Sequence, residues 1–437
     1  MSEDSPFGDL LDGANEVERP SGRGGRIALI VFLVLVLVVS GGSGGYVWWA
    51  SAAPLAAPTV TSSAPSVAPG AKAEVRLPAS GSMLVSVAGG ESYLGPDAAG
   101  AWLSSGGDDA RPIASIAKLV TALVVLDAHP LADANDPGPT IAYTEADTDL
   151  YDQYYVRGAT IARMPDGLKL SLHDSLETML LPSASNYATA IARWAYGSDG
   201  AYVDAARSWL SRNGLNSTRI VDATGIDDRN TSTPSDLLAL GRIAAANPTI
   251  AAIAATQWAD LPAGPGNIEN TNALLGTSGI TGLKTGNLGD GTFNLLFTSV
   301  LDVGIGAPLH VLGVRLGGET RASANQDVVV LLESIRDGFH TLQVGTVGAE
   351  VGEITTPWGS SAKVVVAQNA SIMTWSDTPV ATSLDTTTPE KYADGEKVGT
   401  ITWTAGPNTA SADVKISGAI EEPTLWWRLT HPTQLGG

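Results

Sequence analysis

Hydrophobic residues form one long uninterrupted run near the start of the chain and shorter, patterned groups after it. Residues 27–39 are all apolar, and residues 27–49 contain no charged side chain. A stretch of that length is enough for a helix that crosses a membrane. The pattern therefore predicts a tail over residues 1–26 and a transmembrane helix over residues 27–49.

Basic residues flank this stretch on one side. Arg19, Arg23 and Arg26 precede it, and the next basic residue is Lys72. Because positive residues mark the cytoplasmic side of a span, we expect the tail in the cytoplasm and everything after residue 50 outside it. The small-x-small sequence at residues 50–52 leaves a cleaved signal peptide as the alternative. Both interpretations place the bulk of the chain in an extracytoplasmic compartment.

The segment at residues 50–72 is rich in Pro, Ala and Ser. Such a composition cannot bury a core, and the chain stays extended at about 3.1 Å per residue where it is polyproline-like. We interpret it as a linker that holds the folded part up to roughly 60 Å from the bilayer.

Residues 73–345 alternate between helical and strand patterns. Two short apolar runs around Gly89-Gly90 suggest a hairpin of residues 83–87 and 91–94. Apolar residues at helical spacing, with capping residues and Pro at the starts, predict a series of helices, and later alternating runs predict strands. The predicted helices are 115–127, 171–181, 187–196, 201–212, 234–246, 249–256 and 325–339, and the predicted strands are 295–300 and 310–316.

The helical signal stops after about residue 345. Residues 351–354, 362–367, 398–404 and 412–416 are short β-rich runs separated by Pro, Gly, Asp and Thr. We predict a separate, small all-β domain over residues 346–437.

Composition narrows the chemistry. The 437 residues include 45 acidic and 25 basic side chains, a formal net charge of -20, which is the opposite of what nucleic-acid binding needs. There is no cysteine, so thiolate nucleophiles, disulfides and zinc fingers are excluded. Five scattered histidines offer little for a metal site, and we expect no metal and no cofactor.

Serine is the remaining obvious nucleophile, and it needs a base. In Ser115-Ile116-Ala117-Lys118 the lysine follows the serine by three residues, so that on a helix both side chains lie on one face. A second S-x-x-K, Ser360 to Lys363, leads into a predicted strand, which would separate the two side chains. The G-x-S-x-G sequence at residues 41–45 lies inside the predicted membrane helix. Context favours Ser115 and Lys118.

Two further motifs support a serine site. Lys284-Thr285-Gly286 offers a cation and a hydroxyl for a carboxylate, together with a glycine that lets a ligand approach the backbone. Residues 182–186, Pro-Ser-Ala-Ser-Asn, form a polar turn between two predicted helices. Ser185 or Asn186 in this turn can also simply cap the helix that follows.

These motifs, in this order, make the chain resemble the serine-type D-Ala-D-Ala carboxypeptidases among the low-molecular-mass penicillin-binding proteins, the peptidase family S11 type. The likeness extends over about residues 75–345 and includes further blocks at residues 180–184, 224–227, 232–237 and 270–275. It implies an α/β penicillin-binding/β-lactamase-like transpeptidase fold, with a central antiparallel sheet and a helical subdomain, followed by a small all-β domain.

The resemblance also implies roles. Ser115 would be the nucleophile, Lys118 its base and Ser183 a proton relay. The substrate would be a peptidoglycan stem peptide ending in D-Ala-D-Ala, and β-lactam antibiotics would be covalent inhibitors.

Residues after the nucleophile would bind the substrate. Lys284, Thr285 and Gly286 would bind the peptide and its terminal carboxylate, and the backbone N–H of Asn287 would complete an oxyanion hole with that of Ser115. The chain departs from the family pattern at two points. Family members are often held by a C-terminal amphipathic helix, whereas this chain ends in Trp426-Trp427-Arg428 and a polar tail, and its predicted anchor is N-terminal. In addition, Ser185 stands where the family has the asparagine of S-x-N, and Asn186 follows one place later. Which of the two makes the amide contact with substrate stays open from the sequence.

Two competing functions share part of this pattern. A class A β-lactamase also has S-x-x-K and K-T-G, but it needs a glutamate for deacylation. The only glutamate between Ser185 and Lys284 is Glu269, which has no E-x-x-L-N around it. A non-catalytic muropeptide-binding or penicillin-sensing protein is the other alternative, suggested by Ser185.

Overall fold

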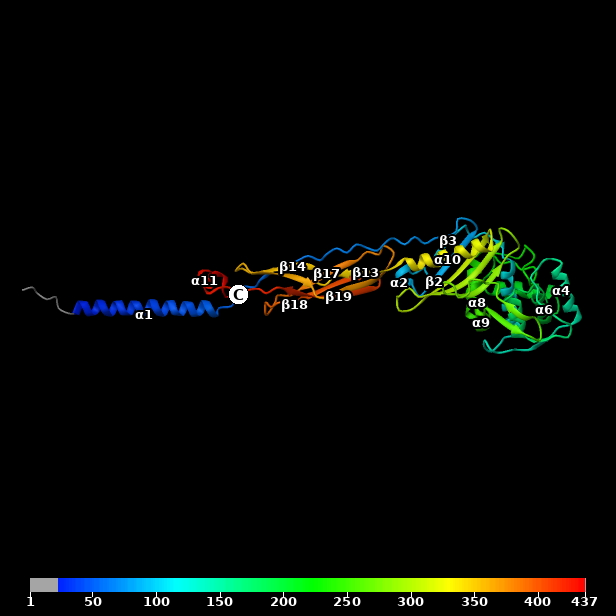
Figure 1. The fold of residues 1–437 in the computed structure, drawn as a ribbon, viewed down its shortest axis with the longest axis horizontal. Helices are drawn as coiled ribbons and strands as arrows, with labels where there is room; N and C mark the ends of the chain where they lie inside the picture. The colour runs from blue at the N-terminus through cyan, green and yellow to red at the C-terminus, as the bar shows by residue number, and fades with distance from the viewer. Residues whose placement is uncertain (1–22, 437) are drawn as a thin grey trace, which may run out of the picture.

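The computed structural model describes residues 23–436, and the predicted cytoplasmic tail therefore lies mostly outside the described residues. Helix α1 runs from Arg23 to Ala52 and projects from one end of the molecule, where its C-terminal end contacts the last helix, α11 (Leu425–Thr430) (Figure 1). It is longer than the predicted span at both ends. Within the described residues it is the one single helix that is long and apolar enough to cross a membrane, and none of its most apolar window is buried in protein.

A five-stranded antiparallel sheet, in the order β10-β11-β12-β2-β3, forms the centre of the part of the chain predicted to be catalytic. Its strands are β10 (Ile280–Gly286), β11 (Phe293–Leu301), β12 (Leu309–Gly318), β2 (Ser82–Ala88) and β3 (Leu103–Ser105). Helix α10 (Arg321–Asp337) packs on one face over an apolar cluster that includes Val85, Phe297 and Leu331. The predicted partner of β2 at residues 91–94 is instead the short helix α2 (Glu91–Leu94), and β3 and β12 flank β2.

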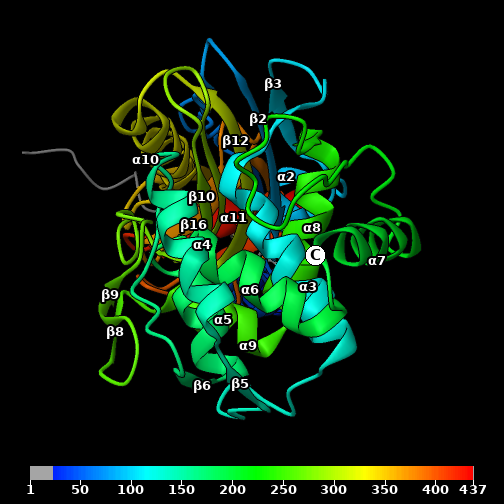
Figure 2. The same cartoon turned by 90° about the vertical axis from the view of Figure 1, so that its right-hand side faces the viewer.

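Helices cover the other face of the sheet and form a subdomain around α3 (Figure 2). Helix α3 (Ala117–Ala128) follows a 3₁₀ turn, Ala114–Ile116, and ten of its twelve residues are buried. The surrounding helices are α4 (Glu145–Tyr155), α5 (Leu172–Leu180), α6 (Ser185–Tyr196), α7 (Asp199–Arg212), α8 (Pro234–Ala246) and α9 (Pro248–Ala255). Short paired strands complete this part: β4 (Arg111–Pro112) with β7 (Thr231–Ser232), β5 (Thr140–Ala142) with β6 (Lys169–Ser171), and β8 (Trp258–Leu261) with β9 (Gly266–Glu269).

The C-terminal part is β-rich, as predicted, with a six-stranded sheet in the order β1-β14-β15-β19-β18-β17. Its strands are β14 (Glu350–Thr355), β15 (Ser361–Val366), β17 (Ala381–Thr386), β18 (Lys397–Ala405) and β19 (Asn408–Ser417). A second layer pairs β13 (Phe339–Gly345) with β16 (Ala370–Trp375), and Trp403 is fully buried in this domain. Since β13 belongs to this pairing, the β-rich part begins before residue 346.

The sixth strand of that sheet comes from the predicted linker. Strand β1 (Thr59–Ser62) pairs antiparallel with β14, Thr59 opposite Thr355. Further along, His340 Nε2 lies 2.9 Å from the Ala71 carbonyl and the Ala73 N–H donates to Ser376 Oγ at 2.9 Å. The segment is extended, as expected, but it runs along the β-rich domain and is not a free tether (Figure 1). A segment without a core of its own can still complete the unpaired backbone of an edge strand.

Aromatic contacts join the β-rich domain to the catalytic part. The rings of Tyr93 and Phe339 lie 5.6 Å apart, and those of Trp102 and Trp375 lie 6.0 Å apart. Asn408 Nδ2 donates to Tyr93 Oη at 2.7 Å. The β-rich domain thus lies between α1 and the catalytic domain in an elongated molecule (Figure 1).

Candidate active site

A cleft of about 980 Å³ opens between the edge strand β10 and the helical subdomain. Ser115, Ser183, Ser185, Thr285 and Asn287 all contribute to its walls. Residues from three separate sequence motifs therefore line one cleft, near the end of β10.

Ser115 lies in the 3₁₀ turn that leads into α3, half-buried at the base of the cleft. Lys118 is completely buried, and its Nζ donates to Ser115 Oγ at 3.0 Å and to the Thr224 carbonyl at 2.7 Å. Burial lowers the pKa of Lys118 to about 7, against a smaller opposing effect of the Asp222 carboxylate. A lysine with such a pKa is neutral in a large share of molecules at neutral pH and can then accept a proton.

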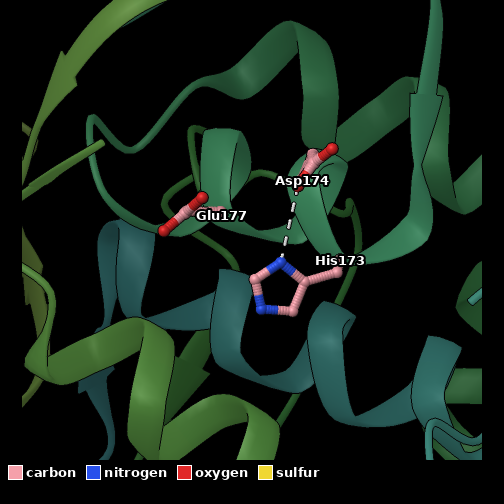
Figure 3. Close-up of side chains that lie close together, drawn as sticks. All are labelled: His173, Asp174 and Glu177. Carbon is pink, nitrogen blue, oxygen red and sulfur yellow. Dashed lines mark ion pairs between the residues drawn. The ribbon is translucent and has the colours of Figure 1, made fainter. Parts of the chain in front are cut away.

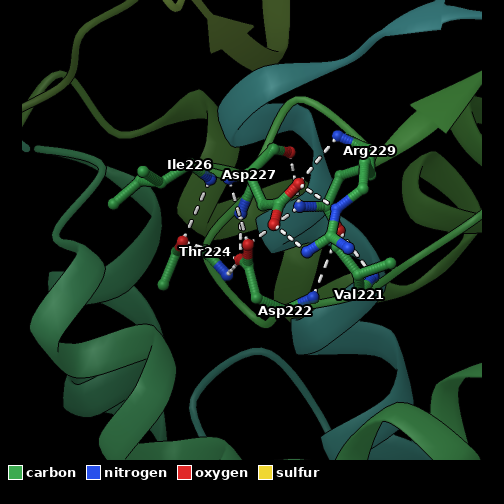
Figure 4. Close-up of polar contacts among 8 residues, drawn as sticks. Val221, Asp222, Thr224, Ile226, Asp227 and Arg229 are labelled. Carbon is green, nitrogen blue, oxygen red and sulfur yellow. Dashed lines mark hydrogen bonds and ion pairs between the residues drawn. The ribbon is translucent and has the colours of Figure 1, made fainter.

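The Asp222 carboxylate organises the loop that carries the Thr224 carbonyl (Figure 4). Its Oδ1 accepts hydrogen bonds from Thr224 N at 2.6 Å, Thr224 Oγ1 at 2.7 Å and Gly225 N at 2.7 Å. Its Oδ2 accepts from Asp227 N at 3.1 Å and from Asn230 Nδ2 at 3.0 Å. One side chain thus fixes both the acceptor for Lys118 and the turn that follows it.

Two glycines enclose the turn of the nucleophile. A Cβ at Gly225, which has φ +81°, would lie 1.9 Å from the Ala114 carbonyl oxygen. A Cβ at Gly286 would lie 2.7 Å from the Ile113 carbonyl oxygen. The backbone before Ser115 is therefore held between the Asp222 loop and β10, with no room for a side chain on either one.

Lys284 is buried and is not among the residues that line the cleft. Its Nζ donates to the Thr285 carbonyl at 3.2 Å. Burial lowers its pKa well below the ordinary value, and the nearby cations Lys118 and Arg321 act in the same direction. On the cleft side, Thr285 Oγ1 and Thr271 Oγ1 share a 2.6 Å hydrogen bond, and Arg321 Nη1 donates to the Thr271 carbonyl at 3.1 Å. The cation that faces the open cleft beside Thr285 is Arg321.

Ser183 occupies the turn between α5 and α6 in a left-handed conformation, φ 70°. Its side chain is buried, and its Oγ has no hydrogen-bond partner among residues 23–436. A strained residue whose buried hydroxyl lacks a partner is typical of a functional site.

Neither Ser185 nor Asn186 caps a helix, and the two side chains lie in different surroundings. Helix α6 begins at Ser185, and its N-cap is Ala184, which has no side chain to cap it, so capping by Ser185 or Asn186 is wrong. Ser185 lines the cleft. Asn186 is fully buried outside it, with Nδ2 donating to the Ala162 carbonyl at 2.8 Å and Oδ1 accepting from Ala162 N at 3.1 Å. Asn186 therefore fixes a neighbouring segment and is not available to a ligand in the cleft.

Several cleft residues were not predicted as site residues. They include Thr271, Arg157, Arg229 and Arg321. Thr271 lies in a sequence block that carried the resemblance, whereas the arginines have no local signal, because only the fold brings them to the cleft. The decoy pair Ser360 and Lys363 is separated as expected, and Lys363 forms an exposed ion pair with Glu350 at 2.7 Å.

A separate group of ionisable side chains lies at the start of α5, apart from the cleft lining (Figure 3). His173, Asp174 and Glu177 each place one ligand atom within 4.8 Å of the others. His173 Nδ1 lies 3.6 Å from Asp174 Oδ1, and this contact raises the pKa of His173 and lowers that of Asp174. The ion pair accounts for the arrangement of His173 and Asp174.

The chain is similar in sequence to a family of known proteins. The profile of a family described as D-alanyl-D-alanine carboxypeptidase matches residues 97–313. A D-alanyl-D-alanine endopeptidase of Haemophilus influenzae is 29% identical over 198 residues, which cover 44% of this chain and 64% of that protein. The D-alanyl-D-alanine carboxypeptidase DacD of Salmonella typhimurium is 23% identical over 266 residues, 59% of this chain and 64% of that protein. The chain thus spans somewhat less than two thirds of the length of these relatives.

The fold is similar to that of solved structures. Penicillin binding protein 5 from Haemophilus influenzae superposes with a TM-score of 0.51 at 17% identity, covering 79% of this chain and 98% of that one. The expected fold class, a penicillin-binding transpeptidase fold followed by a β-rich domain, is confirmed.

Proposed function

We propose that this chain, whose residues 97–313 match the D-alanyl-D-alanine carboxypeptidase family, removes the terminal D-alanine from peptidoglycan stem peptides through an acyl-enzyme on Ser115. The observation that supports this most directly is the 3.0 Å contact between Ser115 Oγ and the Nζ of a fully buried lysine. In this proposal neutral Lys118 takes the Ser115 proton as Oγ attacks the carbonyl of the last peptide bond.

The surrounding groups support the steps that follow. The N–H groups of Ser115 and Asn287 stabilise the oxyanion. D-Alanine leaves after it gains a proton, which Ser183 relays through its unpartnered hydroxyl. A water molecule then attacks the ester carbonyl and gives up a proton, the bond to Oγ breaks, and Ser115 Oγ takes up that proton as the shortened peptide leaves.

The terminal carboxylate of the substrate is held by hydroxyl and cationic groups. Thr285 and Arg321 line the cleft and are the direct contacts in this proposal. Lys284 supports this region from its buried position, where its Nζ donates to the Thr285 carbonyl at 3.2 Å. Gly286 lines the cleft, and its lack of a side chain lets β10 approach the turn before Ser115. Ser185 takes the place of the amide residue of S-x-N and contacts the peptide through its hydroxyl, with a weaker hold than an amide gives.

A fluorescent penicillin tests the acyl-enzyme. The wild-type chain should label covalently and Ser115→Ala should not label, while Ser360→Ala, the serine of the other S-x-x-K, should label as the wild type does. A wild-type protein that stays unlabelled would contradict the assignment of Ser115. Release of D-alanine from a D-Ala-D-Ala pentapeptide then separates an enzyme from a protein that only binds muropeptides.

Endopeptidase activity is the second candidate, because relatives at 29 to 32% identity carry that name. The same acyl-enzyme would then form at the D-alanyl bond of a cross-link. Incubation with a purified cross-linked muropeptide dimer distinguishes the two: monomer formation without D-alanine release from pentapeptide would favour the endopeptidase.

We further propose that α1 anchors the protein in the cell membrane, with residues 1–26 in the cytoplasm and the catalytic domain outside. We place the domain boundaries at the ends of elements. The span lies within α1, the linker includes β1, the catalytic domain ends with α10, and the β-rich domain begins with β13. Protease accessibility of the catalytic domain in intact cells and spheroplasts tests this orientation.

A further inference from the structure

A second groove adjoins the cleft. It has a volume of about 540 Å³ and shares Thr271 with the cleft as a wall residue. Each of its three walls begins where a wall of the cleft ends, at the neighbouring pairs Thr160 and Ile161, Ser183 and Pro182, and Thr271 and Asn270. The second groove is therefore a continuation of the cleft, and we name it the side groove.

Hydrogen bonds fix the walls of the side groove. The first turn of α6 holds one wall, where Asn186 bonds both backbone groups of Ala162 and Tyr187 Oη donates to the Arg163 carbonyl at 2.9 Å. The wall after β9 is held by the Thr271 N–H, which donates at 3.0 Å to the carbonyl of the residue after α5. Both walls are thus fastened to the helices on either side of the turn that carries Ser183, and the side groove is preformed.

The register of the substrate along β10 decides which end of it faces the side groove. In the proposed mode Thr285 holds the terminal carboxylate and the N–H of Asn287 meets the attacked carbonyl, so the leaving residue lies toward Thr285. Thr271 shares a 2.6 Å hydrogen bond with Thr285 and also lines the side groove. The side groove therefore opens on the leaving-group side. A single D-alanine ends at its carboxylate and has no further atoms to place there.

Two exposed side chains of opposite charge, Arg163 and Glu269, line the side groove from different walls. Arg163 Nη1 donates to the Gly264 carbonyl at 3.3 Å, and within residues 23–436 the Glu269 carboxylate has no hydrogen bond or ion pair. An arginine binds a carboxylate, and a carboxylate accepts from peptide N–H groups. Trp258, opposite Glu269 in the β8–β9 hairpin, is 63% exposed and adds an apolar surface at the rim. This lining fits a peptide that carries a free carboxylate.

We propose that the side groove binds the leaving peptide of a cross-link, an acidic peptide joined through its amine to the D-alanyl carbonyl, and that Arg163 binds its carboxylate. This rests on the proposed acyl-enzyme. Ser115 Oγ forms the ester with the D-alanyl carbonyl carbon as the C–N bond of the cross-link breaks. The released nitrogen takes the proton that Lys118 accepted from Ser115, relayed by Ser183, and leaves as the amine of the second peptide. Cross-linked peptides are then substrates in addition to the pentapeptide, whose D-alanine leaves without contacting the side groove.

The test compares a purified cross-linked muropeptide dimer with the pentapeptide, using the full chain and two variants. Arg163→Gln removes the cation, and Asn267→Trp fills the side groove from β9. Arg163→Gln should lower kcat/KM for the dimer about tenfold, the effect of one charge-assisted hydrogen bond, and Asn267→Trp should abolish dimer cleavage. Both variants should keep the pentapeptide activity and the penicillin labelling of the wild type. Arg207→Gln, an exposed arginine on α7, is the matched control and should cleave both substrates normally.

A dimer whose leaving peptide has amidated carboxylates separates binding by Arg163 from a structural role. The wild type should cleave it about as slowly as Arg163→Gln cleaves the unmodified dimer, and the variant should not distinguish the two dimers. If the wild type releases D-alanine from the pentapeptide but does not cleave the dimer, or if both variants cleave the dimer normally, the assignment of the side groove is wrong and the carboxypeptidase stands. Loss of pentapeptide activity in Arg163→Gln would also overturn it. If penicillin labels no variant and not the wild type, the acyl-enzyme itself fails.

Discussion

Replacement of Asp222 by asparagine tests how the Asp222 loop positions and tunes Lys118. The substitution keeps the shape and one oxygen, which can still serve Thr224 and Gly225. It places an NH₂ group where Oδ2 accepts from Asp227 N and Asn230 Nδ2. Two charge-assisted hydrogen bonds are lost, each contributing about 1.5–3 kcal/mol. Because Asp222 is half-buried and water replaces part of the loss, we expect a destabilisation of about 3 kcal/mol.

The same change has a separate effect on the pKa of Lys118. The Asp222 carboxylate raises this pKa, although burial, the larger effect, brings it down to about 7. Removing the carboxylate lowers the pKa further, so neutral Lys118 becomes available at lower pH. The acid limb of the pH profile for acylation should therefore move to lower pH in Asp222→Asn, while the plateau falls because the Thr224 carbonyl is less well held.

The assay uses penicillin labelling for both effects. Loss of labelling with increasing urea reports unfolding of the catalytic domain, and the labelling rate against pH gives the acid limb. Asp228→Asn is the matched control for stability, since Asp228 is an exposed acid of the same loop and its carboxylate makes no hydrogen bond or ion pair within residues 23–436. An acid limb that moves to higher pH, or an unchanged urea midpoint, would refute the reasoning.

Other expectations follow from the same geometry. In the wild type, the acid limb of acylation should have its midpoint near pH 7, because Lys118 acts when neutral; a midpoint near pH 10, measured by the labelling rate, would exclude a lysine desolvated in this way. Gly225→Ala should slow acylation roughly a hundredfold, since the new Cβ displaces the turn before Ser115, and it should change the KM less than the rate. Asn186→Ala should lower the urea midpoint by leaving both polar groups of Ala162 unpaired in a buried site, a cost of about 1–3 kcal/mol per group, whereas Ser185→Ala should alter peptide KM and leave that midpoint unchanged.

The elements that the sequence predicted best have local signals. Helix α8 has the predicted bounds, because Thr233 caps it with a 3.2 Å hydrogen bond from Asp236 N and Pro234 begins it. The S-x-x-K spacing is also local, and three residues of helix suffice to bring Lys118 to Ser115. Helix α4 was not predicted, although Thr144 and Asp147 form a capping box at its start, because its polar residues obscure the apolar helical pattern.

The sequence could not determine positions that depend on distant parts of the chain. Asn186 and Ser185 differ by one helical step of about 100°, so the start of α6 decides which side chain faces the cleft. Lys284 precedes a cleft residue in sequence but is buried and does not line the cleft, because neighbouring residues of a strand point to opposite faces. The linker strand β1 has no pattern of its own, and only the open edge of β14 makes it a strand.

The pairing of β1 with β14 also describes how the molecule is assembled in time. Thr59 and Thr355, which lie opposite each other, are separated in sequence by the whole domain that carries the cleft, so that domain is an insertion within the β-rich module that follows α1. A chain made from its N-terminus must complete the catalytic domain before the strands that pair with β1 exist, and contacts of such sequence separation form late. The six-stranded sheet therefore closes only after the synthesis of the inserted domain is complete.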